Sequence, residues 1–167
     1  MTEIPDVRWG RSDGVLGRAA TRIASTRPGS WLVRTAMPLD RKILARTAGR
    51  RTLLGPIGAP TLLLETTGRR TGQPRQSPLL FARDGESVVV VGSNFGQQHH
   101  PAWTANLLAD PAAVVLAGGR RIPVRATLLE GDEAEAAYRK MIEVTTVYQV
   151  YRGRTDRRIR VFRLTPV

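Results

Sequence analysis

The fold is decided by the stretch Thr61-Leu-Leu-Leu-Glu-Thr-Thr-Gly-Arg-Arg-Thr-Gly-Gln-Pro-Arg-Gln-Ser-Pro-Leu-Leu-Phe81, in which two apolar runs flank an arginine-rich turn. Residues 61–66 have the length and composition of a buried strand, and residues 75–81 return as a second strand. Pro78 cannot donate to a ladder of hydrogen bonds, so this second strand is expected at a sheet edge or a bulge. The stretch therefore predicts a β-hairpin.

Strand and turn signals continue to the end of the chain. Asp84-Gly85 is a two-residue hairpin signal that leads into the apolar run 87–91. Another hairpin is predicted between 114–116 and 122–129, across two glycines, and residues 159–164 supply a last strand. Short helices are expected at 101–109 and after Gly131. About six short antiparallel strands with few helices predict an α+β, mainly β protein built on a small barrel.

The start of the chain has a different character, because residues 1–60 hold eleven basic and four acidic side chains. Apolar residues repeat at helical spacing over 15–24, and Pro28-Gly29 ends that pattern. A second helix is predicted from Pro38 to Gly49, with Leu39 buried. We therefore expect a basic helical segment at 1–52 and a β-barrel cofactor-binding domain at 53–167. The first helix either packs on this domain or lies on an anionic membrane.

The composition narrows the chemistry and the location. The net charge is +12, and only Lys42 and Lys140 are lysines, so arginine supplies nearly all of the basic groups. Because cysteine is absent, a disulfide, a thiol nucleophile and a thiolate-ligated metal are excluded. Neighbouring His99 and His100 lack a carboxylate cluster, so no metal site is predicted. With no secretory signal and no apolar run of about 20 residues, the expected location is the cytoplasm, or peripherally the inner face of the membrane.

The turn at 68–75 is a candidate anion site. Its glycines let backbone N–H groups approach an anion, and Arg69, Arg70 and Arg75 can form charge-assisted hydrogen bonds with a phosphate. No helix follows the turn, so it is neither a P-loop nor a dinucleotide-binding fingerprint. From composition alone, residues 68–75 could also be an ordinary solvated hairpin turn that binds no anion.

A second candidate group lies between residues 92 and 106. Gly92, Ser93 and Asn94 end a strand, and a polar loop then enters a helix in which Trp103 and Asn106 share one face. The chain has no nucleophile elbow and no acid pair spaced for glycoside hydrolysis. This favours an enzyme whose cofactor carries the chemistry.

Taken together, the ordered elements resemble the deazaflavin (F420)-dependent nitroreductase family over roughly residues 55–167. The elements are Thr66-Thr-Gly-Arg-Arg-Thr-Gly-Gln-Pro-Arg75, Ser77-Pro-Leu79, Gly92-Ser-Asn94, His100-Pro-Ala-Trp103 with Asn106, and Thr155-Asp-Arg157. The resemblance implies a split β-barrel related to barrels that bind flavin mononucleotide (FMN), with coenzyme F420 as hydride carrier. It implies hydride transfer to an electron-poor acceptor such as a quinone, an enone or a nitroaromatic.

The resemblance also implies residue roles. Tyr148 and Tyr151 would lie on the substrate side, where either could donate a hydrogen bond to developing negative charge. Many members carry a lysine where this chain has Asn94, and Thr145 stands where another tyrosine can occur, so the substrate preference does not transfer. The cofactor would be held by Arg69, Arg70, Thr71, Gly72, Gln73, Pro74, Arg75, Ser77, Gly92, Ser93, Asn94, Ala102, Trp103 and Asn106.

Two other functions remain open at this stage. One is an FMN-dependent oxidoreductase with the same fold. The other is a non-catalytic protein that binds deazaflavin or nucleic acid, although an aromatic content of 5% disfavours a base-stacking surface. The expected partner is a small-molecule acceptor, with nucleic acid disfavoured, and the chain is expected to be a monomer or a homodimer.

Overall fold

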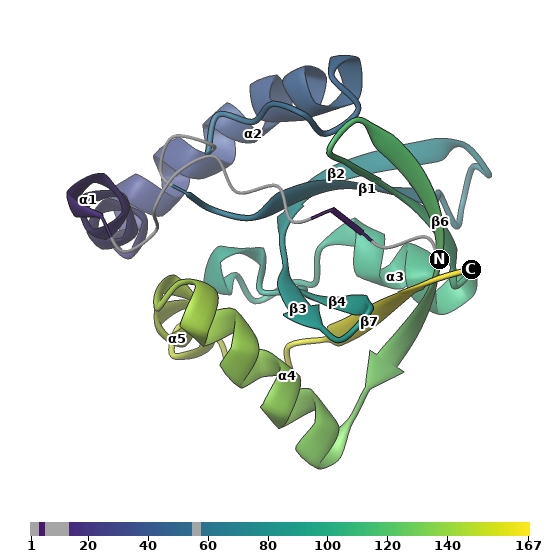
Figure 1. Ribbon diagram of the computed structural model, residues 1–167. Helices are drawn as coiled ribbons and strands as arrows, with labels where there is room; N and C mark the ends of the chain where they lie inside the picture. Colours follow the sequence, from purple (N-terminus) through teal and green to yellow (C-terminus); the bar gives the residue numbers. More distant parts are fainter. Residues whose placement is uncertain (1–3, 6–13, 55–57) are drawn as a thin grey trace.

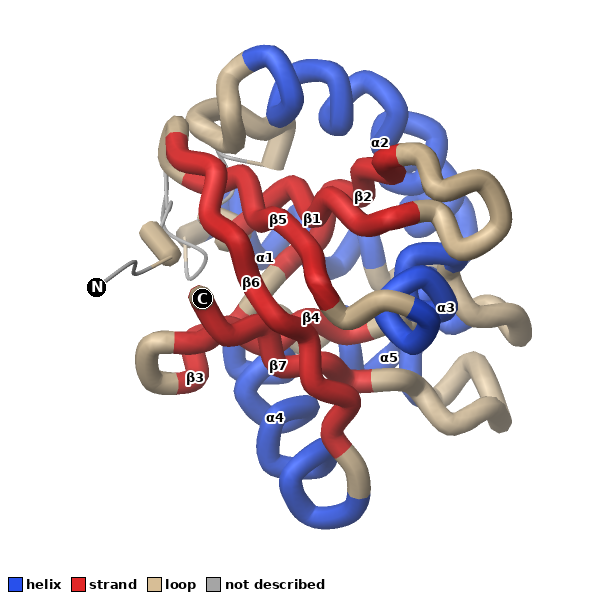
Figure 2. The backbone as a smooth tube through the Cα atoms, turned by 90° about the vertical axis from the view of Figure 1, so that its right-hand side faces the viewer, coloured by secondary structure: helices blue, strands red, loops and turns tan. Residues whose placement is uncertain are grey.

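The protein is built on one antiparallel sheet of seven strands, seen in a computed structural model that describes residues 4–5, 14–54 and 58–167 (Figures 1 and 2). The strands are ordered β2-β1-β5-β6-β7-β4-β3. Their bounds are β1 Thr61–Thr67, β2 Pro74–Leu80, β3 Ala82–Asp84, β4 Ser87–Val91, β5 Ala112–Ala117, β6 Arg120–Leu129 and β7 Val161–Pro166.

The sheet curls because its two edge strands are consecutive in the chain. Strand β2 ends at Leu80 and β3 begins at Ala82, so only Phe81 separates the two edges. The Phe81 N–H donates to the carbonyl of Pro60 at 3.2 Å, and its ring is buried. The split-barrel prediction is confirmed, with one strand more than expected because β3 is separate from β2. Pro78 lies on an edge strand, as predicted.

The core lies inside the curl and beneath two helices on its outer side. Along β6, Ile122, Val124 and Ala126 are buried while the residues between them are exposed, which is the alternation of a half-covered strand. Strand β4 is buried at all five positions. Its continuous apolar run fits a strand covered on both faces, because Met141 and Tyr148 pack on its outer side.

The N-terminal helices differ in part from the prediction. Helix α1 is Val15–Ala24, and α2 is Arg27–Arg46. Helix α2 begins directly after the short turn that ends α1. Pro28 suits a first helical turn, and the Thr26 hydroxyl caps the helix by accepting from the Gly29 N–H at 3.0 Å. The predicted start at Pro38 is therefore wrong. The predicted burial of Leu39 is also wrong, since this side chain is 56% exposed.

Three further helices complete the fold: α3 Ala102–Ala109, α4 Gly131–Val144 and α5 Val147–Arg152. The sequence predicted the first two but not α5, which is short and rich in valine and tyrosine. Helices α4 and α5 cover the outer side of β4. Helix α1 contacts α5, and α2 packs on β1 and β2 (Figure 1). Within the residues that the structure describes, no helix combines the length and apolar character needed to cross a membrane.

Candidate cofactor site

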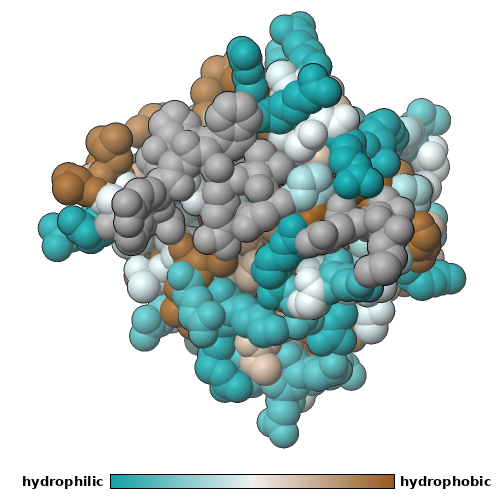
Figure 3. Space-filling view, in the orientation of Figure 1, coloured by the Kyte–Doolittle hydropathy of each residue, from teal (hydrophilic) through white to brown (hydrophobic). Residues whose placement is uncertain are grey.

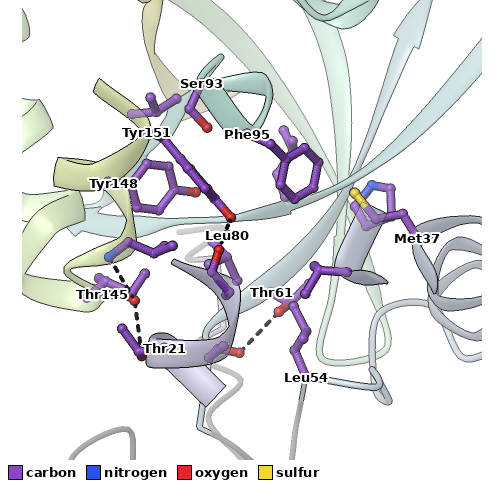
Figure 4. A pocket seen from close by; sticks show the side chains of 18 of the residues that line it. Thr21, Met37, Leu54, Thr61, Leu80, Ser93, Phe95, Thr145, Tyr148 and Tyr151 are labelled. Atoms are coloured by element: carbon purple, nitrogen blue, oxygen red, sulfur yellow. Dashed lines mark hydrogen bonds between the residues drawn. The ribbon is translucent and has the colours of Figure 1, made fainter. Parts of the chain in front are cut away.

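A cavity of about 380 Å³ lies between the N-terminal helices and the barrel (Figure 4). Its size is at the lower end of pockets that hold a small organic molecule or a ring system. Among the residues that the structure describes, no Asp, Glu, Lys, Arg or His lines it. The lining comprises Gly17, Ala20, Thr21, Ile23, Ala24, Val33, Met37, Leu54, Ala59, Thr61, Pro78, Leu79, Leu80, Val91, Ser93, Asn94, Phe95, Pro101, Trp103, Val144, Thr145, Val147, Tyr148 and Tyr151.

Two tyrosines of α5 line the cavity in different ways. Tyr148 is 6% exposed, and no acceptor in the described part of the chain contacts its hydroxyl. The hydroxyl of Tyr151 donates to the carbonyl of Ala24 at 3.4 Å, which ties α5 to the end of α1. Burial raises the pKa of both phenols, so both stay protonated donors at neutral pH. Of these two phenols, Tyr148 is therefore the one whose hydroxyl has no bond to another described residue.

One side of the cavity is formed by residues 92–100, here called the wall loop. Ser93 is 7% exposed, and Figure 4 shows its hydroxyl pointing toward the two tyrosines. Asn94 and Phe95 adopt positive φ angles of 47° and 57°, an uncommon conformation for residues other than glycine. The Phe95 ring packs edge-on against Tyr151 at 5.6 Å between centroids, and the Asn94 amide donates to the His99 carbonyl at 3.0 Å. These contacts hold the two residues with positive φ angles in the wall loop.

The β1–β2 turn, residues 68–75, is here called the arginine hairpin. It is closed by bonds from the Gly68 N–H to the Gln73 carbonyl at 2.8 Å and from the Gly72 N–H to the Gly68 carbonyl at 2.7 Å. A Cβ on Gly68 would lie 2.9 Å from the Thr71 hydroxyl, and Gly72 has a φ of 66°. Both glycines are therefore required by the backbone.

The arginines of this hairpin are exposed. Within residues 4–5, 14–54 and 58–167, no acceptor contacts the guanidinium groups of Arg69 and Arg70, while Arg75 donates to the Thr71 hydroxyl at 3.4 Å. Three positive groups on a rigid turn attract an anion and can form bidentate bonds with it. The hairpin is therefore suited to a phosphate or a carboxylate.

Asn106 connects the hairpin to α3. Its side-chain oxygen accepts from the Arg69 N–H at 3.2 Å, and its NH₂ group donates to the Thr66 hydroxyl at 3.0 Å. Trp103, on the same helix, lines the cavity and packs on Phe162. Helix α3 therefore carries one residue that forms the cavity and one that positions the anion-binding turn.

The structure brings together only part of the predicted cofactor set around the cavity. Ser93, Asn94 and Trp103 line it, whereas Ser77, Gly92 and Ala102 do not. Gly92 permits close packing instead, since a Cβ there would lie 2.7 Å from the Thr104 methyl group. Thr71, Gln73 and Pro74 are exposed in the arginine hairpin.

Sequence reasoning missed the cavity wall formed by α1 and α2, which includes Ala20, Ala24, Val33 and Met37. The only available signal was apolar residues at helical spacing, which a helix packed on any surface also shows. In the described part of the chain, no cluster of three or more His, Cys, Asp or Glu side chains could hold a metal.

These features together fit a cofactor with an uncharged ring system and an anionic extension. The neutral cavity can accept the ring, and the arginine hairpin can hold the anion. Asn106 and Trp103 place both features on α3. The hydroxyls of Ser93 and Tyr148, which belong to cavity-lining residues, have no partner in the described residues and remain available to a bound molecule.

Comparison with known proteins supports a cofactor of this kind. A protein-family profile described as F420H(2)-dependent quinone reductase matches residues 31–166. An F420H(2)-dependent quinone reductase of Mycobacterium tuberculosis is 33% identical over 144 residues, covering 81% of this chain and 95% of the relative.

Two solved structures are similar to this chain. An F420-H2 dependent reductase (FDR-A) has 34% identity and a TM-score of 0.59, over 63% of this chain and 93% of the other. A structure described as a domain-swapped dimer has 30% identity and a TM-score of 0.60, over 82% and 98% of the two chains. That assembly is a property of the relative, and a monomer or homodimer stays the prediction for this chain.

These comparisons confirm two predictions from the sequence. The protein is an F420-dependent reductase, and its cofactor is F420, not FMN. The family profile describes quinone reductases, whereas the resemblance in the sequence was to nitroreductases that use the same cofactor. The chain belongs to the F420H(2)-dependent quinone reductase family.

Proposed function

We propose that the protein reduces an uncharged, quinone-type acceptor with F420H2, and that the cavity holds both the deazaflavin ring and the acceptor. The observation that carries this proposal is a cavity with no charged side chain among its described lining residues, combined with three exposed arginines on the β1–β2 turn. Thr61 and Leu80 line the cavity at one end of these two strands, and the turn lies at their other end. Neutral walls favour an apolar acceptor, because an ionised one would lose hydration without gaining a partner.

The cofactor would be held at two places. Arg69, Arg70 and Arg75 would bind its phosphodiester and the first carboxylates of its tail, while the ring would lie along Ser93 and Asn94. When bound, the reduced deazaflavin supplies the hydride. The chain would contribute orientation and exclusion of water, because most of the side chains that line the cavity are apolar (Figure 4).

Tyr148 would act on the acceptor side. A hydride added to a quinone leaves negative charge on an oxygen, and a hydrogen-bond donor aimed at that oxygen lowers the barrier. The Tyr148 hydroxyl has no partner among the described residues and faces the cavity, whereas the Tyr151 hydroxyl is bonded to Ala24. Tyr148 would therefore be the donor, and Tyr151 would hold α1 in place.

The test is an oxidation assay with F420H2 and three acceptors: a soluble quinone, an anionic quinone sulfonate and a nitroimidazole. We expect F420H2 oxidation with the neutral quinone and weaker activity with the sulfonate. NADH should not replace F420H2. Oxidation of F420H2 by none of the three acceptors, with the protein folded and the cofactor bound, would contradict a reductase function.

The N-terminal helices suggest where such an acceptor comes from. These helices carry large apolar side chains that are each more than half exposed. Figure 3 shows hydrophobic surface, in brown, in the region of these helices. These side chains are Val15, Leu16, Ile23, Trp31, Leu32 and Leu39. Exposed arginines at 22, 27, 34 and 41 accompany them. Within the predicted 1–52 segment, helices α1 and α2 would thus form one wall of the cavity and dock peripherally on an anionic membrane, while the 53–167 domain would bind the cofactor.

Sedimentation with liposomes tests the docking. The whole protein should sediment with vesicles containing phosphatidylglycerol and much less with phosphatidylcholine alone. The double variant Leu16→Ser/Trp31→Ser should remain in the supernatant. Leu108→Ser on α3 removes another exposed leucine, 48% exposed, outside the two N-terminal helices and should behave as wild type. Equal sedimentation of the double variant and the wild type would exclude docking through α1 and α2.

A further inference from the structure

The wall loop contains a backbone turn that the surrounding structure must hold in place. Asn94, Phe95 and Gly96 follow one another with φ angles of 47°, 57° and 75°. Non-glycine residues in this region cost free energy, and they persist where neighbouring contacts fix them. A Cβ on Gly96 would lie 2.8 Å from the carbonyl oxygen of Tyr151, so the turn is also packed tightly on α5.

Arg157 makes the contacts that join the two ends of this loop. One terminal nitrogen donates to the carbonyl oxygens of Gly92 and Ser93 at 2.9 and 2.7 Å. Its Nε donates to the carbonyl of Gln97 at 2.8 Å, and its other terminal nitrogen lies 3.1 Å from Nδ1 of His100. Because a guanidinium can only donate, Nδ1 accepts this bond and His100 carries its proton on Nε2.

Arg157 does not line the cavity, whereas three residues of the loop it holds do: Ser93, Asn94 and Phe95. The carbonyl of Ser93 is bonded to Arg157, and the hydroxyl of the same residue points into the cavity. A change in the Arg157 contacts would therefore move the Ser93 hydroxyl and the Phe95 ring, which packs on Tyr151.

We propose that Arg157 is a positioning residue that sets the distance between the deazaflavin ring and the acceptor, by fixing the wall loop against which the ring would lie. The inference rests on the proposed function. Arg157 is not a ligand of the cofactor phosphate, since its four bonds to the loop use the same nitrogens that would bind an anion. A geometric error of a fraction of an ångström at the reacting atoms is sufficient to slow a transfer step.

A lysine cannot reproduce these bonds, because it has one nitrogen in place of a planar fork. Arg157→Lys therefore keeps the charge and removes the geometry, while Arg157→Ala removes both and leaves room for added guanidinium ion. Arg158→Gln is the matched control. Arg158 follows Arg157 in the chain, its side chain is exposed, and it forms a surface ion pair with Glu130 at 3.4 Å.

The experiment measures three quantities for each protein: the thermal midpoint, the dissociation constant for oxidised F420, and the single-turnover rate of hydride transfer to a soluble quinone at saturating cofactor. We expect both Arg157 variants to lose about tenfold or more in the single-turnover rate. Non-denaturing guanidinium should restore part of the rate in Arg157→Ala and none in Arg157→Lys. Arg158→Gln should match wild type.

A purely structural role would lower the thermal midpoint and leave the single-turnover rate of the folded, saturated protein unchanged, and this result overturns the inference. If Arg157→Ala does not fold, Arg157→Lys decides by the same criterion. Wild-type protein that binds no F420 overturns the proposed function together with the inference. Wild-type protein that binds F420 and reduces the quinone, with unchanged rates in both variants, overturns only the inference.

Discussion

The backbone N–H of Arg69 donates a 3.2 Å hydrogen bond to the side-chain oxygen of Asn106, which ties the arginine hairpin to helix α3. The NH₂ group of Asn106 is also used, in a bond to the Thr66 hydroxyl. Both polar atoms of a side chain that is 5% exposed are therefore occupied by the protein. We propose that Asn106 influences cofactor binding through the hairpin that it holds.

Replacing Asn106 should weaken both the fold and cofactor binding. Asn106→Ala leaves the Arg69 N–H and the Thr66 hydroxyl without this partner, which should cost about 1–3 kcal/mol in the free energy of unfolding. The dissociation constant for F420 should rise because the hairpin loses its attachment. Urea unfolding and F420 titration measure the two effects, with Leu108→Ala on the same helix as control. Unchanged F420 binding in Asn106→Ala would show that the attachment is not needed.

The arginine hairpin should set the salt dependence of cofactor binding. Arg69→Gln, Arg70→Gln and Arg75→Gln should each raise the dissociation constant for F420 about tenfold at low salt, as expected for the loss of a charge-assisted bond. The loss should shrink as ionic strength rises. Arg139→Gln on α4 changes the net charge equally at an exposed position far along the chain from the hairpin. An equal effect of Arg139→Gln would indicate general charge attraction and not a site.

Substitutions of the two tyrosines of α5 should have different effects, one on catalysis and the other on stability. Tyr148→Phe removes the unpartnered donor and should lower the turnover number on the order of 100-fold, with little change in stability. Tyr151→Phe removes the 3.4 Å bond to Ala24 and should lower the free energy of unfolding by about 0.5–1.5 kcal/mol. Steady-state kinetics and urea unfolding on both variants provide the comparison. A larger loss of turnover in Tyr151→Phe would reverse the proposed roles.

Stability should fall in mildly acidic solution because of His100. Burial, followed by the positive charges of Arg160 and Arg157, lowers the pKa of His100 below its usual 6.5. The unfolded state therefore takes up this proton more readily, so the stability that neutral His100 contributes is complete above about pH 6.5 and is lost as the pH falls toward the lowered pKa.

Urea unfolding between about pH 7.5 and pH 5 measures this dependence. His100→Asn keeps an acceptor for Arg157 and should flatten the slope below about pH 6.5. His99→Asn, at the exposed neighbouring position, should keep the wild-type slope. An identical slope in wild type and His100→Asn would assign the effect to other groups.

The sequence predicted the parts of the fold that depend on local signals. Pro78 and the Asp84-Gly85 turn located an edge strand and a hairpin, because proline and glycine restrict the backbone wherever they occur. The start of α2 was misplaced because Pro28-Gly29 suits a helix start as well as a helix end, and the Thr26 cap decides between them. Helix α5 was missed because six residues give too little periodicity.

The candidate site was predictable in its chemistry but not in its geometry. Adjacent arginines and glycines identified the anion-binding turn, and the resemblance identified the cofactor. The contacts of Arg157 with four residues of the wall loop join positions about 60 apart in the chain, so no local pattern shows them. The roles of Tyr148 and Tyr151 differ only through Ala24, which lies on a helix distant in sequence.

The most direct test of the central claim is a fluorescence titration of the whole protein with oxidised F420 and, in parallel, with flavin mononucleotide. The account predicts tight binding of F420 that weakens in Arg69→Gln/Arg70→Gln, and much weaker binding of flavin mononucleotide that is less affected by the same substitution. Equal affinity for the two molecules, or F420 binding that does not depend on the arginine hairpin, would contradict the account.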